Sequence, residues 1–180
     1  MSVDRDSIAY AQNYCEENVW QLSRHPQLPA GVRYAVFISS LAGRCAMWSQ
    51  RAAEQPGSPV IWDYHAVLMV ESQIFDLDCT AGLPLSLRRY LEVTFPFGNE
   101  VDPELRPSFR VIEAGEFRRT FASDRSHMRG ADGGWLHPPP EWPAILAPGQ
   151  TMNLPSFIDM RPAGFGEILD LELLSSRFGG

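Results

Sequence analysis

Apolar residues near the start of the chain recur with the spacing of an amphipathic helix. One apolar stripe of this kind predicts a helical segment, and its members are Ile8, Ala9, Ala11, Val19, Trp20 and Leu22. Pro26 follows the stripe, and the residue before a proline disfavours helical backbone. The helical segment should therefore end at about His25.

The start of this segment has two possible positions. In one, Ser7 caps a single long helix, which holds Cys15 in its interior. In the other, Asn13 caps a second helix, with Glu16 three residues on as in a capping box. Only the second arrangement places Cys15 in a first helical turn, where unpaired backbone N–H groups favour an anion.

Runs of β-branched and aromatic residues predict the strands. Residues 34–38 form a short apolar run, and residues 60–70 form a longer run directly after the turn-forming segment 55–59. Residues 72–78 should pair with 60–70 as a hairpin, because so few residues separate the two. Later segments predict a strand at 109–112, helices at 84–90 and 115–120, short elements from 156–159 and 166–170, an ordered surface loop at 131–148 and a loose tail at 178–180.

This order of elements predicts an α/β (α+β) fold, with a mostly antiparallel central sheet flanked by helices. The length of 180 residues suits one domain, over residues 1–180. No apolar run reaches the length of a membrane span. The first residues lack a basic start followed by an apolar stretch, so no secretory signal is expected.

Charge excludes several kinds of partner. The net charge is -7, and the sequence has no basic footprint for nucleic acid or an anionic membrane. All 15 basic residues are arginine, which excludes Schiff-base chemistry on lysine. Three cysteines cannot form a closed set of disulfides, and with no signal segment we expect a reducing cytoplasm. A zinc site is not favoured, because the cysteines and histidines form no closely spaced pair.

The predicted hairpin brings a histidine close to acidic residues. In one register His65 lies directly opposite Asp76, and in a register shifted by two residues it lies opposite Asp78. Both acids share one strand face, because side chains alternate with a period of two. Directly opposed residues are close enough for an imidazole–carboxylate hydrogen bond. No Asn-Gly or Asp-Gly turn fixes the register.

A thiol nucleophile needs such a base, and the base needs an orienting acceptor. We expect Cys15 to pack its helix start against the face that carries His65, with backbone N–H groups available to a developing oxyanion. Glu16 and Glu17 should raise the pKa of the thiol if they lie close to it. Two acids beside a nucleophile suit a substrate that brings a positive charge.

Several sequence blocks, in order along nearly the whole chain, resemble the protein N-terminal glutamine amidohydrolase family. They are Tyr-Cys-Glu-Glu-Asn at 14–18, Tyr-Ala-Val-Phe-Ile-Ser at 34–39, Pro-Val-Ile-Trp-Asp-Tyr-His at 59–65, Phe-Asp-Leu-Asp at 75–78, Phe-Arg-Val-Ile at 109–112, Phe-Ala-Ser-Asp-Arg-Ser-His-Met at 121–128, the proline cluster at 138–140 and Met-Asn-Leu at 152–154. The combination is far more specific than any single short motif. The sequence departs from animal members at Cys79, at 41–46 and in the loop 81–97.

The resemblance implies a papain- or transglutaminase-like fold and an enzyme that converts a protein's N-terminal glutamine to glutamate with release of ammonia. It matches Cys15 to the nucleophile, His65 to the base and Asp76 to the orienting acid, and so favours the register that sets His65 opposite Asp76. It implies no metal or organic cofactor. In nucleated cells it places such an enzyme in an N-degron pathway.

The substrate's α-amine is cationic over much of the neutral range, so a carboxylate should bind it. The candidates are Glu16, Glu17 and Asp63, and alternation places Asp63 on the strand face of His65. The polar segment 124–127 either lines the cleft or orders the following loop. We expect a cytoplasmic monomer. A transglutaminase, a cysteine peptidase and a non-enzymatic binder of N-terminal glutamine are the alternatives.

Overall fold

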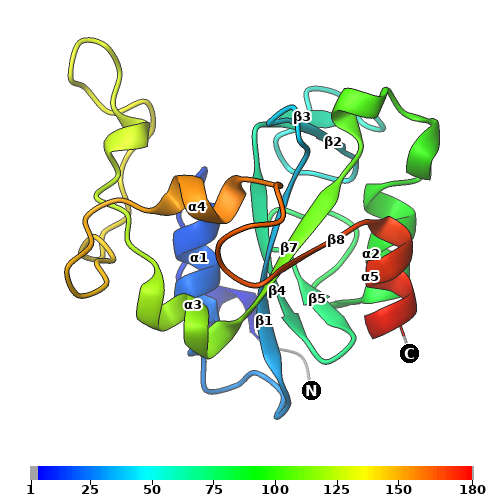
Figure 1. The fold of residues 1–180 in the computed structure, drawn as a ribbon, viewed down its shortest axis with the longest axis horizontal. Coiled ribbons are helices and arrows are strands. Elements are labelled where there is room, and N and C mark those ends of the chain that lie inside the picture. The colour runs from blue at the N-terminus through cyan, green and yellow to red at the C-terminus, as the bar shows by residue number, and fades with distance from the viewer. Residues whose placement is uncertain (1–3, 180) are drawn as a thin grey trace.

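The computed structural model describes residues 4–179. A six-stranded sheet lies at its centre, and Figure 1 shows how the helices are arranged around it. Every neighbouring pair is antiparallel, which confirms the expected α+β class. Its strands, in spatial order, are β6 (Leu85–Ser86), β5 (Gln73–Phe75), β4 (His65–Val70), β1 (Arg33–Ser39), β7 (Ser108–Glu113) and β8 (Glu167–Leu169).

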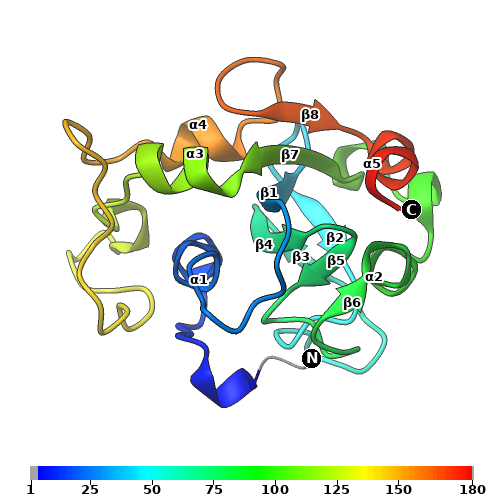
Figure 2. The same cartoon turned by 90° about the horizontal axis from the view of Figure 1, so that it is seen from below.

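Helices cover both faces of the sheet (Figure 2). One face carries α1 (Cys15–Leu22), α3 (Ala114–Thr120) and α4 (Leu154–Ile158), and the other carries α2 (Leu87–Thr94) and α5 (Leu171–Phe178). Strand alternation builds the two cores. Ala66 and Leu68 of β4 pack with the first group of helices, whereas Val67 and Met69 pack with the second.

The first helix begins at Cys15, so the structure confirms the arrangement that places this residue in a first turn. Its N-cap is Tyr14, without a side-chain cap, and the expected cap at Asn13 is wrong. Asn13 instead has a φ of 65°, in the left-handed region that asparagine tolerates. The side chain of Asn18 bonds both the N–H and the C=O of Ala11, at 2.8 Å each. These hydrogen bonds fix the backbone of the segment that precedes the helix.

The predicted strand 60–70 is two strands in two sheets. β3 (Val60–Trp62) pairs with β2 (Cys45–Met47), which the sequence analysis missed, and β4 starts only at His65. The backbone between them leaves the sheet at Asp63 and Tyr64. The strand alternation that placed Asp63 on the face of His65 therefore does not apply.

The register expected for the hairpin is wrong by two residues. Leu68 pairs with Phe75, and this register continued would set His65 opposite Asp78. The ladder ends at Phe75, however, because the chain turns at Asp76, whose Oδ1 accepts the N–H of Asp78 at 2.9 Å. This turn brings the carboxylate of Asp76 to His65, although Asp76 is not paired with any residue of β4.

The later predictions hold, with shifted ends. β7 and α3 fall where a strand and a helix were expected, and α4 and β8 fall where short elements were expected. The helix predicted at 84–90 begins only at Leu87, three residues after Pro84, as α2. The predicted tail at 178–180 is wrong at Phe178, which ends α5, and Gly180 lies outside the described residues.

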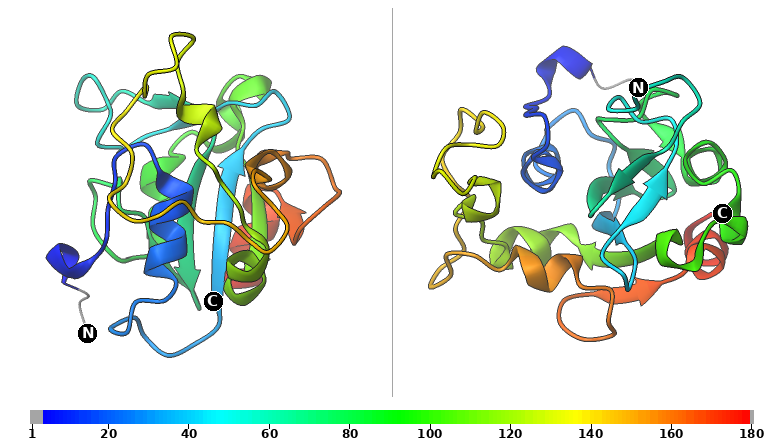
Figure 3. Two further views of the ribbon diagram at one scale, coloured as in Figure 1. Left: turned by 90° about the vertical axis from the view of Figure 1, so that its left-hand side faces the viewer. Right: turned by 90° about the horizontal axis from the view of Figure 1, so that it is seen from above.

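Segment 131–148 has no helix or strand and projects on the side of α1 and α4 (Figures 1 and 3). Between residues 4 and 179, none of the helices combines the length and apolar character needed to span a bilayer.

Candidate active site

The thiol of Cys15 lies where the first helix meets the end of β4. Helix α1 packs on the sheet face opposite the one that carries His65, so the expected packing against the face of His65 is wrong. Both residues still lie at the start of β4, because His65 is the first residue of that strand and precedes Ala66, whose backbone N–H hydrogen-bonds the Cys15 sulfur. Both Cys15 and His65 line one cavity.

His65 is held by a buried carboxylate. Its Nε2 lies 2.9 Å from Oδ1 of Asp76, and both side chains are almost fully buried. Oδ2 of Asp76 accepts a hydrogen bond from Tyr90 at 2.9 Å and one from Gln50 at 3.2 Å. Trp62 stacks on the imidazole with ring centroids 5.7 Å apart. With Nε2 engaged, Nδ1 is the ring nitrogen left for a reacting group.

This pairing shifts both pKa values toward the charged forms. Burial alone lowers the pKa of His65, but the charge and hydrogen bond of Asp76, together with Asp78 and Glu16, outweigh burial and raise it. Burial alone raises the pKa of Asp76, but His65 and the hydrogen bonds to the carboxylate lower it overall. An imidazolium at His65 is thus stabilised in place, as a general base requires after it takes a proton.

The thiol itself rests in its protonated form. Burial, followed by the charges of Glu16 and Asp78, raises the pKa of Cys15 well above its usual value. Oε2 of Glu16 lies 3.6 Å from the sulfur and accepts the hydroxyl of Tyr64 at 2.9 Å. Glu16 is fully buried, and burial above all raises its pKa to about 7. To act as a nucleophile, this thiol would need a base to remove its proton.

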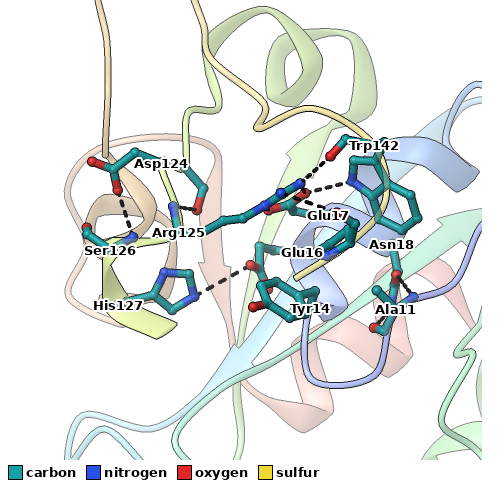
Figure 4. Close-up of polar contacts among 12 residues, drawn as sticks. Ala11, Tyr14, Glu16, Glu17, Asn18, Asp124, Arg125, Ser126, His127 and Trp142 are labelled. Atoms are coloured by element: carbon teal, nitrogen blue, oxygen red, sulfur yellow. Dashed lines mark hydrogen bonds and ion pairs between the residues drawn. The ribbon is translucent and has the colours of Figure 1, made fainter. Parts of the chain in front are cut away.

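Glu17 has a different environment from its neighbour (Figure 4). Its two oxygens accept a bidentate pair of hydrogen bonds from Arg125, at 2.8 Å each, and one oxygen also accepts from Nε1 of Trp142 at 2.7 Å. All three side chains lie away from the cavity lining. These hydrogen bonds hold the segment after α3 and the projecting loop against the first helix.

The cavity beside Cys15 has a volume of about 590 Å³. Asp63 lines it and is exposed, with Oδ1 on the N–H of Tyr64 at 2.9 Å. Much of the wall is apolar, from Met128, Leu136, Met152, Leu154 and Ile158. Such a wall suits the methylene groups of a side chain that ends in a polar group.

Sequence reasoning left out several polar groups of this site. Gln50 and Tyr90, which hold Asp76, lie far from any motif, and only the fold brings them there. From the sequence, segment 124–127 could either line the cleft or order the following loop, and in the structure its residues do both. Arg125 orders the loop, while Ser126 and His127 line the cavity.

His65, Asp76 and Asp78 place three possible metal ligands within 4.8 Å of one another. The donor set fits an ion poorly, because the hydrogen bonds described above use both oxygens of Asp76. Oδ1 of Asp78 likewise accepts the hydroxyl of Tyr10 at 2.5 Å. We therefore assign these groups to a hydrogen-bond network and not to a metal.

A cysteine at a helix start, a histidine–aspartate pair at a strand end and a shared cavity are the elements of a hydrolase with a thiol nucleophile. Comparison with known proteins gives the family. The sequence model described as N-terminal glutamine amidase matches residues 10–178. This chain belongs to that family, which confirms the expected enzyme class, a hydrolase of amide carbon–nitrogen bonds.

Three relatives named protein N-terminal glutamine amidohydrolase match almost the full length. The Homo sapiens protein is 41% identical over 99% of this chain and 91% of its own. The Bos taurus protein is 41% identical over 98% of this chain and 90% of its own length. The Danio rerio protein is 38% identical over 97% of this chain and 91% of its own length.

Proposed function

We propose that this protein hydrolyses the side-chain amide of an N-terminal glutamine, releasing ammonia and leaving an N-terminal glutamate. The observation that carries the proposal is that Cys15 and His65 line one cavity, with Asp76 hydrogen-bonded to His65, in a chain of this family. The names of the relatives indicate the substrate, and the side chains at the cavity indicate the kind of reaction.

In the first step Cys15 attacks the amide carbon of the glutamine side chain. Nδ1 of His65 takes the thiol proton, and Asp76 stabilises the resulting imidazolium through the 2.9 Å contact at Nε2. The sulfur forms a bond to the carbon, and the carbonyl oxygen becomes an oxyanion. The backbone N–H of Cys15, at the start of α1, donates to that oxyanion.

In the second step the tetrahedral intermediate breaks down. His65 gives its proton to the amide nitrogen, the carbon–nitrogen bond breaks, and ammonia leaves. A thioester remains between Cys15 and the substrate. A water molecule, deprotonated by His65, then attacks the thioester, and the sulfur leaves as the free thiol with the proton from His65. The product is glutamate.

The substrates we propose are proteins or peptides with a free N-terminal glutamine, acted on by one domain as a cytoplasmic monomer within an N-degron pathway. Three acids were expected to bind the α-amine. Glu17 is not proposed for this role, because its oxygens already accept hydrogen bonds from Arg125 and Trp142. Glu16 and Asp63 remain.

The experiment compares two peptides of identical composition, one with glutamine at the N-terminus and one with glutamine inside the chain. The protein should release ammonia from the first only and make it about one dalton heavier, because one NH₂ is exchanged for OH. Conversion of internal glutamine, cross-linking to an amine or cleavage of the backbone would instead indicate the alternative enzymes. Binding without any product would indicate a non-enzymatic protein.

A further inference from the structure

Two neighbouring glutamates in the first turn of α1 differ in what surrounds their carboxylates. Arg125 and Trp142 saturate the oxygens of Glu17 and neutralise its charge. Glu16, although fully buried, has only uncharged partners: Tyr64 and the thiol of Cys15 both contact Oε2. Of these two glutamates, Glu16 is therefore the one whose charge acts on the nucleophile.

Two kinds of polar atom next to this nucleophile lack a hydrogen-bond partner. Oε1 of Glu16 has none, and neither ring nitrogen of His127 has one. A buried polar atom left without a partner costs free energy, so such atoms mark where a ligand completes the structure. His127 lines the cavity, and its Nε2 lies 3.7 Å from Oε1 of Glu16 (Figure 4).

The geometry points to Glu16 and His127 as the pair that binds the α-ammonium group of the substrate's first residue, an inference that rests on the proposed function. The 3.7 Å separation is too long for a hydrogen bond between the two atoms. One nitrogen atom can lie about 2.8 Å from both and donate to each. Glu16 supplies the negative charge, and His127 supplies an uncharged acceptor.

The state of His127 suits an acceptor. Burial lowers the pKa of its imidazole, against the weaker effects of Glu17, Asp63 and Asp124. A neutral ring offers one nitrogen lone pair, whereas an imidazolium would repel the ammonium group. The acids that line the cavity have partners or solvent already: Asp63 is exposed, and Asp78 accepts the hydroxyl of Tyr10.

Binding of an ammonium group here also acts on the nucleophile. The charge of Glu16 is among the causes that keep the proton on Cys15. A cation at Oε1 offsets that charge, so the thiol loses its proton to His65 more readily once the substrate is in place. Glu16 thus couples recognition of the free amine to activation of the sulfur.

The test compares two substrates that differ only at the α-position: a glutamine-initiated tripeptide, and the same peptide with the α-amine replaced by hydrogen. Ammonia release gives kcat/KM for each. The wild-type protein should favour the amine-bearing peptide by about 10- to 100-fold, the range of a hydrogen bond to a charged group. Glu16→Gln keeps the side-chain volume and should bring this ratio close to one. His127→Phe should lower the ratio about threefold or more.

Asp63→Asn is the matched control, because it neutralises the exposed acid of the same cavity. It should leave the substrate ratio within about twofold of the wild-type value, because exposed charges contribute little. A ratio that survives in both Glu16→Gln and His127→Phe, or that collapses in Asp63→Asn, overturns the assignment.

The wild-type result separates two kinds of failure. Equal turnover of the two peptides overturns the amine subsite alone. No ammonia from either peptide overturns the proposed function, and the subsite with it. Because each variant is compared with itself on two substrates, a general loss of activity cancels from the ratio.

Discussion

Replacing Glu16 with glutamine should stabilise the protein at alkaline pH and have a much smaller effect in mild acid. Burial, first of all, raises the pKa of this carboxyl from 4.5 to about 7. A folded-state pKa above the unfolded one means that the native fold is most favoured below pH 4.5 and loses stability as the pH rises to 7. At about 1.4 kcal/mol per pKa unit, the loss is about 3 kcal/mol.

Urea unfolding of the wild-type protein and Glu16→Gln at pH 5 and at pH 8 measures this effect. Part of the loss has already occurred at pH 5, so the difference in unfolding free energy between the two proteins should grow by about 2 to 3 kcal/mol between the two conditions. A difference of the same size at both pH values would refute the reasoning that Glu16 ionises at a cost inside the fold.

The same variant should make the sulfur more reactive. Because the charge of Glu16 helps to keep the pKa of Cys15 high, Glu16→Gln should shift the pH profile of alkylation by iodoacetamide toward lower pH. Peptide mapping assigns the alkylated cysteine, with Cys15→Ala as the blank. An unchanged profile would show that Glu16 does not act on the thiol.

Other changes test the positions around the site. Asp76→Asn should lower kcat for ammonia release by about 10³- to 10⁴-fold in a folded protein, because an amide cannot stabilise the imidazolium of His65; a loss below tenfold would exclude an orienting role. Arg125→Met leaves the carboxylate of Glu17 buried without its charged partner and should cost about 3 to 5 kcal/mol in urea unfolding. Adding Glu17→Gln to Arg125→Met should recover most of that loss, and no recovery would contradict the ion-pair account.

The elements with a strong local pattern could be predicted from the sequence. The apolar strand at β7 and the helix α3 lie where periodicity placed them, because their burial follows from one segment at a time. β2 has three residues and pairs only with β3, so it has no pattern of its own. The hairpin register depends on where the chain leaves the ladder at Asp76, and alternation does not reveal that.

The candidate site, like the fold, could be predicted from the sequence only where local patterns decide the outcome. Local motifs and the family resemblance made Cys15, His65 and Asp76 the candidates; in the structure Cys15 and His65 line one cavity, and Asp76 is hydrogen-bonded to His65. The environments of Glu16 and Glu17 could not be distinguished from the sequence, because Arg125 and Trp142 reach the helix from 108 and 125 residues further along the chain. Long-range contacts of this kind set the charge at the site.

The measurement closest to the central claim is the mass of the intermediate on the protein. Acid quenching during turnover of a glutamine-initiated peptide should trap an adduct equal to the peptide minus ammonia, located on Cys15 by peptide mapping. Cys45→Ala, a change at a cysteine buried in β2, should form the same adduct and release ammonia at the wild-type rate. Cys15→Ala should do neither while still binding the peptide. Ammonia release by Cys15→Ala, or an adduct on another residue, would contradict the account.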